Sequence, residues 1–322
     1  MNKHWPCLDG LRGVLALAVV FLHFDINILF HRLFGMQALW IELAVDVFFL
    51  LSGFVLTHSV RNGTTFRIFA AKRLLRLMPV YYITTLAAVM VVPALPRDLW
   101  AELLVAGPFF LRNPVNFPAW SICFELYLPL LAVLLPIRLP QKLVRPALVL
   151  ALLGCGICMM YFQERHIMYA PRAIFGLAAG HLLYRAKLEC RLPFDLLALG
   201  VIALILAAGF APPAIFVIPF AAAAAILAGT RAGTMGGGRL FSSPPAQWLG
   251  SISYTLYLVH APVLYALGVS LGPAAGQNPV AKLAGLAASL ILATVLTKVV
   301  ERPAMALSAR LFPRNGMLGT AA

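Results

Sequence analysis

Long apolar runs separated by short polar segments constrain this chain more than any other feature. Most of the runs reach the roughly 17–25 residues that a helix needs to cross a bilayer. The chain is 62% hydrophobic and only 11% charged, whereas soluble domains have about 25% charged residues. The sequence therefore predicts an all-α, polytopic membrane protein, a bundle of about ten transmembrane helices. The ten runs cover residues 10–30, 38–60, 78–95, 117–137, 144–162, 168–185, 194–211, 213–229, 248–270 and 280–300.

The segments between the runs add little independent structure. "LWAELLVAGPFFL" is apolar but is interrupted by Glu102, Gly107 and Pro108, which favours an interfacial or re-entrant piece. With no internal repeat and no appended soluble domain, residues 1–322 are expected to form a single transmembrane domain. Cys155 and Cys158 form a C-x-x-C in an apolar run, but no second pair completes a metal site, so these residues are interpreted as packing residues.

The distribution of Lys and Arg predicts the orientation of the chain. A net charge of +14 would suggest nucleic acid as the partner of a soluble protein, but in a membrane protein it is expected from cytoplasmic loops. With the N-terminus inside, 19 of the 25 Lys and Arg fall in cytoplasmic segments and Arg172 lies in a helix. The five in outer segments are Arg32, Arg97, Arg112, Arg165 and Lys282. This bias predicts that both termini are cytoplasmic and that nucleic acid is not a partner.

Arg12 opens the first apolar run and His23 lies deep inside it. The two residues share one helical face and are roughly 16 Å apart along the axis. An arginine that extends to the water boundary and a histidine bonded to a neighbouring helix would explain an isolated pair.

Three further ionisable residues fall at a depth similar to that of His23. Asp46, Glu125 and His260 come from three other runs, and with His23 they occupy the outer third to the middle of a hydrocarbon core of roughly 30 Å. Each has a structural alternative: Asp46 can bond a neighbouring helix, and His260 can be a satisfied helix-end group beside Pro262. Because an unpaired carboxylate in lipid is costly, Glu125 should have a partner.

A basic cluster marks the cytoplasmic end of the third run. Arg73 and Arg76 are spaced i, i+3 in "AAKRLLRLMPVYY", on one side of a helix. With Lys72 and Arg12 they can form a site for a multiply phosphorylated ligand; alternatively, they are the positive charge that orients the chain. Pro79 is expected in the first turn of the helix that follows.

At these residues the sequence resembles the acyltransferase-3 family of integral-membrane acyltransferases. "LDGLRGVLALAVVFLH", with Arg12 and His23, resembles the opening of the family. "VDVFFLLSGFVLT", "RLLRLMPVYY" and "AWSICFELY" (Trp120, Ser121 and Glu125) resemble its second, third and fourth blocks, and "LGSISYTLYLVH" and "VERPA" resemble its late blocks. The six motifs occur in the expected order over nearly the whole chain.

The resemblance implies a bacterial inner-membrane O-acyltransferase of polysaccharides or other cell-envelope acceptors. It implies acyl-CoA, usually acetyl-CoA, as a donor that binds from the cytoplasm. No permanently bound cofactor or metal is expected, and the partners are the donor, a saccharide or envelope-glycan acceptor, and membrane lipid. The expected site has catalytic His23, Glu125 and Asp46; donor-binding Arg12, Arg73 and Arg76; and substrate-binding Trp120, Ser121, Tyr254 and His260. Packing is the alternative role of Tyr254.

The expected chemistry is removal of a hydroxyl proton by a neutral His23. Direct transfer to the acceptor is favoured because the sequence contains no convincing Ser or Cys nucleophile, and an acyl-histidine intermediate stays open as an alternative. A proton-coupled transporter is the competing interpretation, since ionisable residues at one depth also describe a proton relay. A purely structural scaffold would leave these buried groups unexplained.

Overall fold

Helices form all the regular secondary structure in the described part of this computed structural model. The structure describes residues 4–24, 41–60, 65–92, 99–110, 113–134, 139–161, 165–209, 211–232, 238–271 and 278–313. The main helices are α1 (Pro6–His23), α3 (Ala44–Ser59), α4 (Phe66–Val91), α6 (Trp120–Leu134), α7 (Gln141–Met160), α8 (Arg165–Arg185), α9 (Phe194–Ala207), α10 (Ile218–Gly229), α12 (Pro244–Leu271), α13 (Pro279–Leu296) and α14 (Arg302–Leu311). Short pieces are η1 (Ile41–Leu43), α5 (Leu99–Leu103), η2 (Gly107–Phe110), η3 (Phe117–Ala119) and η4 (Pro212–Phe216).

Six helical stretches in these ranges are long and apolar enough to cross a membrane. They are Pro6–His23, Phe66–Val91, Phe117–Leu134, Gln141–Met160, Pro212–Gly229 and Pro279–Leu311. Helices α3 and α9 are apolar but shorter, and the expected spans at 168–185 and 248–270 correspond to α8 and α12. The prediction of an all-α membrane protein is therefore confirmed, with six candidate spans in the described part of the chain.

Helix α4 differs from the expected third span. It begins at Phe66, where the Thr65 side chain accepts a hydrogen bond from the backbone N–H of Ile68 at 3.4 Å. Arg73 and Arg76 consequently lie within the helix. The prediction that Pro79 occupies the first turn of a helix is wrong, because Pro79 lies in the interior of α4, a position that membrane helices tolerate.

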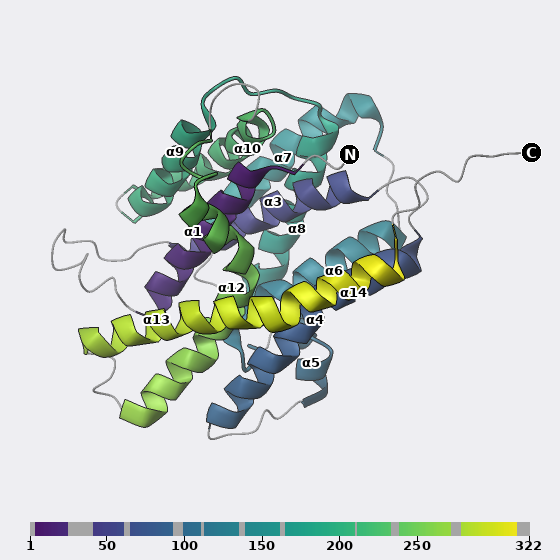
Figure 1. The fold of residues 1–322 in the computed structure, drawn as a ribbon. Helices are drawn as coiled ribbons and strands as arrows, with labels where there is room; N and C mark the ends of the chain where they lie inside the picture. Colours follow the sequence, from purple (N-terminus) through teal and green to yellow (C-terminus); the bar gives the residue numbers. More distant parts are fainter. Residues whose placement is uncertain are drawn as a thin grey trace, which may run out of the picture.

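One long helical rod runs along the front of the bundle (Figure 1). It consists of α13, a π-helical turn at Thr297–Glu301, and α14. Inserted π turns are often found at functional sites. This turn directs Glu301 and Arg302 of the "VERPA" motif toward the cavity described below.

Glycines bring the central helices into backbone contact. A Cβ at Gly13 of α1 would collide with the backbone of Gly250 in α12, and a Cβ at Gly53 of α3 would collide with the backbone of Leu177 in α8. Small residues allow this close approach in membrane helices. As a result, α1 with Arg12 and His23 lies against α12, which carries Tyr254 and His260.

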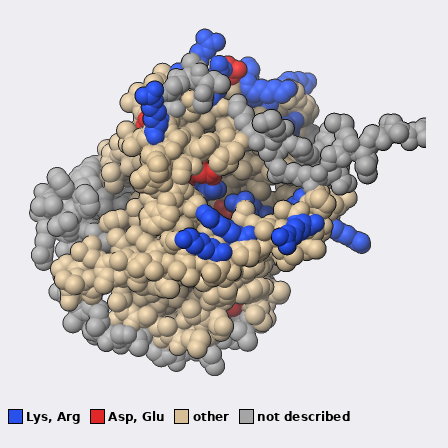
Figure 2. Space-filling view, viewed as in Figure 1, with Lys and Arg blue, Asp and Glu red and all other residues tan. Residues whose placement is uncertain are grey.

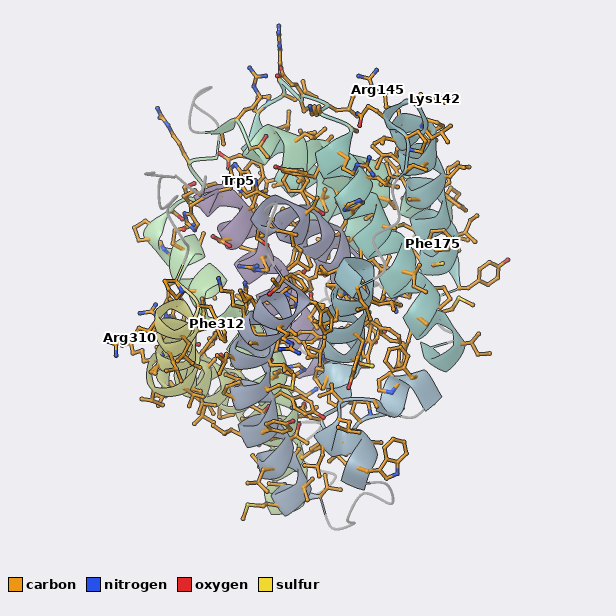
Figure 3. All side chains as sticks on the ribbon, turned by 90° about the vertical axis from the view of Figure 1, so that its right-hand side faces the viewer. Trp5, Lys142, Arg145, Phe175, Arg310 and Phe312 are labelled. Atoms are coloured by element: carbon orange, nitrogen blue, oxygen red, sulfur yellow. The ribbon has the colours of Figure 1, made fainter. Side chains whose placement is uncertain are left out.

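Several residues used to orient the chain cannot be placed. Lys3, Arg32, Arg61, Arg97, Arg112, Arg138 and Arg314 lie outside the described residues. Of the basic residues that are described, Lys142 and Arg145 project from one end of the molecule near the start of α7 (Figure 3).

Candidate active site

A cavity of about 430 Å³ lies among α1, α3, α4, α6, α12, the π turn and the start of α14. On the face shown in Figure 2, Lys and Arg surround a hollow that has acidic side chains inside it. We call this space the arginine cavity, after Arg12, Arg73, Arg76 and Arg302 in its lining. Its other charged lining residues are Asp9, Glu125 and Glu301.

Arg12 is held at the rim of the cavity by an ion pair within its own helix. One of its terminal nitrogens lies 2.6 Å from Oδ1 of Asp9, and Nε2 of His4 lies 2.7 Å from the other Asp9 oxygen. The Arg12 side chain is 31% exposed. A guanidinium in this position can meet an anion that enters from the polar end of α1.

Arg73 is buried and holds Glu125 through a carbonyl that a proline leaves unpaired. Pro129 has no N–H, so the Glu125 carbonyl lacks its normal helical partner. Nε and one terminal nitrogen of Arg73 donate to that oxygen at 3.1 and 2.5 Å. The Glu125 carboxylate lies 3.7 Å from Arg73 and accepts a hydrogen bond from Oγ of Ser52 at 2.7 Å. These contacts orient Glu125 toward the cavity.

Arg76 and Arg302 are the cavity arginines available to an added anion. Both are exposed, and no acidic side chain in the described ranges forms an ion pair with either. The neighbouring Glu301 is buried and accepts a hydrogen bond from Thr255 at 2.7 Å. Unpaired guanidinium groups match the oxygens of phosphates well.

Asp46 bonds a neighbouring helix, which was the structural alternative to a role at the site. It forms a buried bidentate pair with Arg172 of α8, with N–O distances of 3.0 and 2.6 Å. Arg172 also lies over the Trp120 ring, 5.2 Å from its centroid, and Trp120 stacks on Tyr169. Asp46 and Trp120 thus belong to a packed cluster between α3, α6 and α8, outside the lining of the cavity.

His23 and His260, which we call the histidine pair, lie together beyond the cavity. Nδ1 of His23 lies 3.0 Å from Nε2 of His260. The Tyr257 ring lies 6.1 Å from the His260 ring, and the Tyr257 hydroxyl is 3.3 Å from Oγ of Ser121. Since Tyr257 and Ser121 line the cavity and the histidines do not, one aromatic layer separates the two regions.

The family model described as "Acyltransferase domain" matches residues 5–298, which include the cavity lining except His4, Glu301, Arg302 and Met305. This chain belongs to the acyltransferase-3 family. It is therefore an enzyme that transfers acyl groups other than aminoacyl groups, as the motif resemblance indicated.

Two curated proteins are similar to this acyltransferase in sequence. "Acyltransferase MdmB" of Streptomyces mycarofaciens is 29% identical over 96% of the chain and 93% of its own length. "Protein 2 in picA locus" of Rhizobium radiobacter is 35% identical over 37% of the chain and 75% of its own length. No solved structure matches the chain significantly.

The acyltransferase site also contains residues that sequence reasoning did not single out. Ser52 and Arg302 line the cavity, and Arg172 pairs with Asp46. Ser52 and Arg302 lie in motifs that were recognised without assigning a role to these positions. For Arg172, its location inside an apolar helix was a signal, because such a charge should have a buried partner.

Proposed function

We propose that this acyltransferase moves an acyl group, by family default acetyl, from acyl-CoA to a hydroxyl of a saccharide or cell-envelope acceptor. The observation that carries the proposal is a cavity lined by four arginines with a histidine pair one aromatic layer beyond it. The donor is a substrate and the enzyme needs no resident cofactor.

The arginine cavity would hold the phosphates of the donor. Arg76 and Arg302 provide the unpaired guanidinium groups, and Arg12 lies at the rim. Arg73 adds positive charge from a buried position while it holds Glu125. The pantetheine arm can bridge the roughly 16 Å between the levels of Arg12 and His23, provided that the Tyr257 side chain moves to admit the thioester.

The transfer would proceed with His23 as the general base. His23 accepts the proton of the acceptor hydroxyl, and the oxygen attacks the thioester carbonyl. The C–S bond then breaks, and the CoA thiolate leaves and takes the proton from His23. Glu125 faces the cavity and orients the acceptor or shares the proton, and Ser121 and Tyr254 line the path to the pair. We retain His260, which contacts His23, as a positioning residue, whereas Asp46 and Trp120 contribute through the packed cluster beside the cavity.

The proposed membrane arrangement has ten helices, both termini in the cytoplasm, and one transmembrane domain over residues 1–322. The charge bias of the sequence supports it, as do Lys142 and Arg145 at one end of the molecule (Figure 3). In a bacterial inner membrane, the arginine cavity would then face the cytoplasm and His23 would lie toward the periplasm. An acceptor at the outer side would receive the acyl group without movement of CoA across the membrane.

The test uses protein purified in nanodiscs, with acetyl-CoA binding and consumption measured for wild type and His23→Ala. We expect wild type to bind and consume acetyl-CoA and His23→Ala to bind it without turnover. Slow hydrolysis or acylation of added saccharide or lipid serves as the readout. If wild type neither binds nor turns over any acyl-CoA, the donor assignment fails. The buried histidines and carboxylates would then be tested as a proton path in a transport assay.

A further inference from the structure

The two rings of the histidine pair lie nearly parallel, with one nitrogen of each ring close to the other. Their planes differ by 12° and their centroids are 5.0 Å apart, while the facing nitrogens are 3.0 Å apart. The facing nitrogens are therefore within hydrogen-bond distance, and the rings are too far apart at their centres to lie face to face. This is the geometry of an N–H···N hydrogen bond.

The second nitrogen of His260 determines the direction of that bond. Nδ1 of His260 lies 3.3 Å from the carbonyl oxygen of Leu256, and a carbonyl only accepts. Nδ1 therefore carries the proton, and the neutral ring has its lone pair on Nε2. Nε2 can then only accept from Nδ1–H of His23. A neutral His23 with its proton on Nδ1 has its own lone pair on Nε2.

We propose that His260 is a positioning residue that sets the tautomer of His23, so that Nε2 of His23 is the atom that removes the acceptor proton. This inference rests on the proposed function, in which His23 is the base. In the other tautomer Nε2 would carry a proton and could not accept one. When His23 takes the acceptor proton on Nε2, its Nδ1–H stays bonded to His260, and the proton passes from Nε2 to the departing thiolate.

The surrounding residues hold the pair in this geometry. Pro262 has no N–H, so the Leu258 carbonyl lacks its helical partner. Nδ2 of Asn116 donates to that oxygen and to Oγ1 of Thr84, both at 3.1 Å. The next residue, Phe117, lies edge-on to the rings of His23 and His260 at 4.8 and 5.6 Å. The carbonyl that Pro262 leaves without a helical partner thus binds Asn116, and this bond fixes the neighbouring Phe117 against the pair.

The kinetic test compares His260→Gln with His260→Asn. A glutamine is long enough to place its carbonyl oxygen where Nε2 of His260 lies and can still accept from Nδ1–H of His23. An asparagine reaches only the Nδ1 position. We expect His260→Asn to lower the maximal transfer rate about 10- to 100-fold, with unchanged half-saturating acyl-CoA, and His260→Gln to restore most of the rate. Equal rates for His260→Asn and wild type, together with an inactive His23→Gln, would overturn the inference alone, whereas an active His23→Gln would overturn the proposed function.

The tautomer of His23 can also be determined by spectroscopy, without any substitution at His260. Nitrogen-15 NMR of the wild-type protein labelled at histidine reports which ring nitrogen is protonated, and the His23 signals are those missing from His23→Gln. We expect His23 protonated at Nδ1 and unprotonated at Nε2. A His23 ring protonated at Nε2 in the neutral protein would overturn the assignment whatever the kinetics show.

Discussion

The arginine cavity and the histidine pair are adjacent, but they satisfy their polar groups differently. In the cavity, Arg12 and Arg73 have acidic partners, whereas Arg76 and Arg302 are exposed and form no ion pair with an acidic side chain in the described part of the chain. In the pair, His260 is fully buried and its ring nitrogens face one carbonyl and one other imidazole. In the proposed mechanism, the cavity receives the charged part of the donor and the pair controls where a proton sits.

Both regions use a proline in the same way. Pro129 frees the carbonyl of Glu125, which binds Arg73, and Pro262 frees the carbonyl of Leu258, which binds Asn116. In each case the side chain that donates to the carbonyl comes from another segment of the chain. Arg73 thereby holds Glu125, and Asn116 holds the segment that places Phe117 on the histidine pair. The two regions therefore differ in the residues that are positioned, the Glu125 carboxylate in one and the histidine pair in the other. Both are positioned through a backbone carbonyl that a proline leaves without its helical partner.

The largest expected effect is on turnover at the histidine pair. We expect His23→Gln to lower the single-turnover rate about 10²- to 10⁴-fold, because a positioned general base contributes that much. Rapid-quench measurement with saturating acetyl-CoA and an identified acceptor tests this. His181→Gln, which changes a histidine of α8 outside the cavity lining, is the matched control and should keep its rate. A rate for His23→Gln within a few-fold of wild type would contradict the role.

The next largest effect is expected on stability, at the buried Asp46–Arg172 ion pair, which lies outside both the arginine cavity and the histidine pair. We expect Arg172→Gln to lower the free energy of unfolding by about 3–5 kcal/mol, because it leaves buried Asp46 without its partner. Thermal or denaturant unfolding in detergent measures this, and the double change Asp46→Asn with Arg172→Gln should recover part of the loss. If Asp46→Asn instead abolishes transfer without any loss of stability, Asp46 acts in the chemistry.

A smaller effect is expected for an unpaired cavity arginine. Arg302→Gln should raise the half-saturating acyl-CoA concentration by roughly 10-fold and leave the maximal rate unchanged, since a hydrogen bond to a charged group contributes about 1.5–3 kcal/mol. Arg302→Lys keeps the charge but not the planar fork, so it should fall between the two. A lower maximal rate with unchanged half-saturation would place Arg302 in the chemical step.

The smallest effect concerns the proline-freed carbonyl. Pro129→Ala restores an N–H to the Glu125 carbonyl, so Arg73→Gln should destabilise the Pro129→Ala protein less than it destabilises wild type. We expect a coupling of about 1 kcal/mol, the contribution of a typical hydrogen bond. Unfolding of the four proteins in a double-mutant cycle measures it. Zero coupling would mean that Arg73 contributes through its charge alone.

The helical membrane architecture and the similar depth of His23 and His260 could both be predicted from the sequence. Apolar length identified the helices, and depth placed His23 and His260 at one level, where the structure shows them in contact. Depth could not choose lateral partners, because these depend on which helices pack side by side. Asp46 pairs with Arg172 because α3 and α8 approach closely at Gly53, which no single run reveals.

Local signals also explain what sequence reasoning missed in α4 and at the cavity. The polar residues between Phe66 and Arg76 interrupt the apolar pattern, so the first turns of α4 were not recognised as helix, and Pro79 was assigned to the wrong position. The rule that a helical proline frees the carbonyl four residues earlier applies to both Pro129 and Pro262. It identifies the free acceptors from sequence alone, whereas the donors, Arg73 and Asn116, come from distant segments.

The most direct test of the division between the two regions is a calorimetric titration of CoA into wild type, His23→Gln and Arg76→Gln in nanodiscs. This measurement needs no knowledge of the acceptor. We expect the same dissociation constant for wild type and His23→Gln, and one about 10-fold larger or more for Arg76→Gln. Loss of CoA binding in His23→Gln, or binding by Arg76→Gln equal to that of wild type, would contradict it.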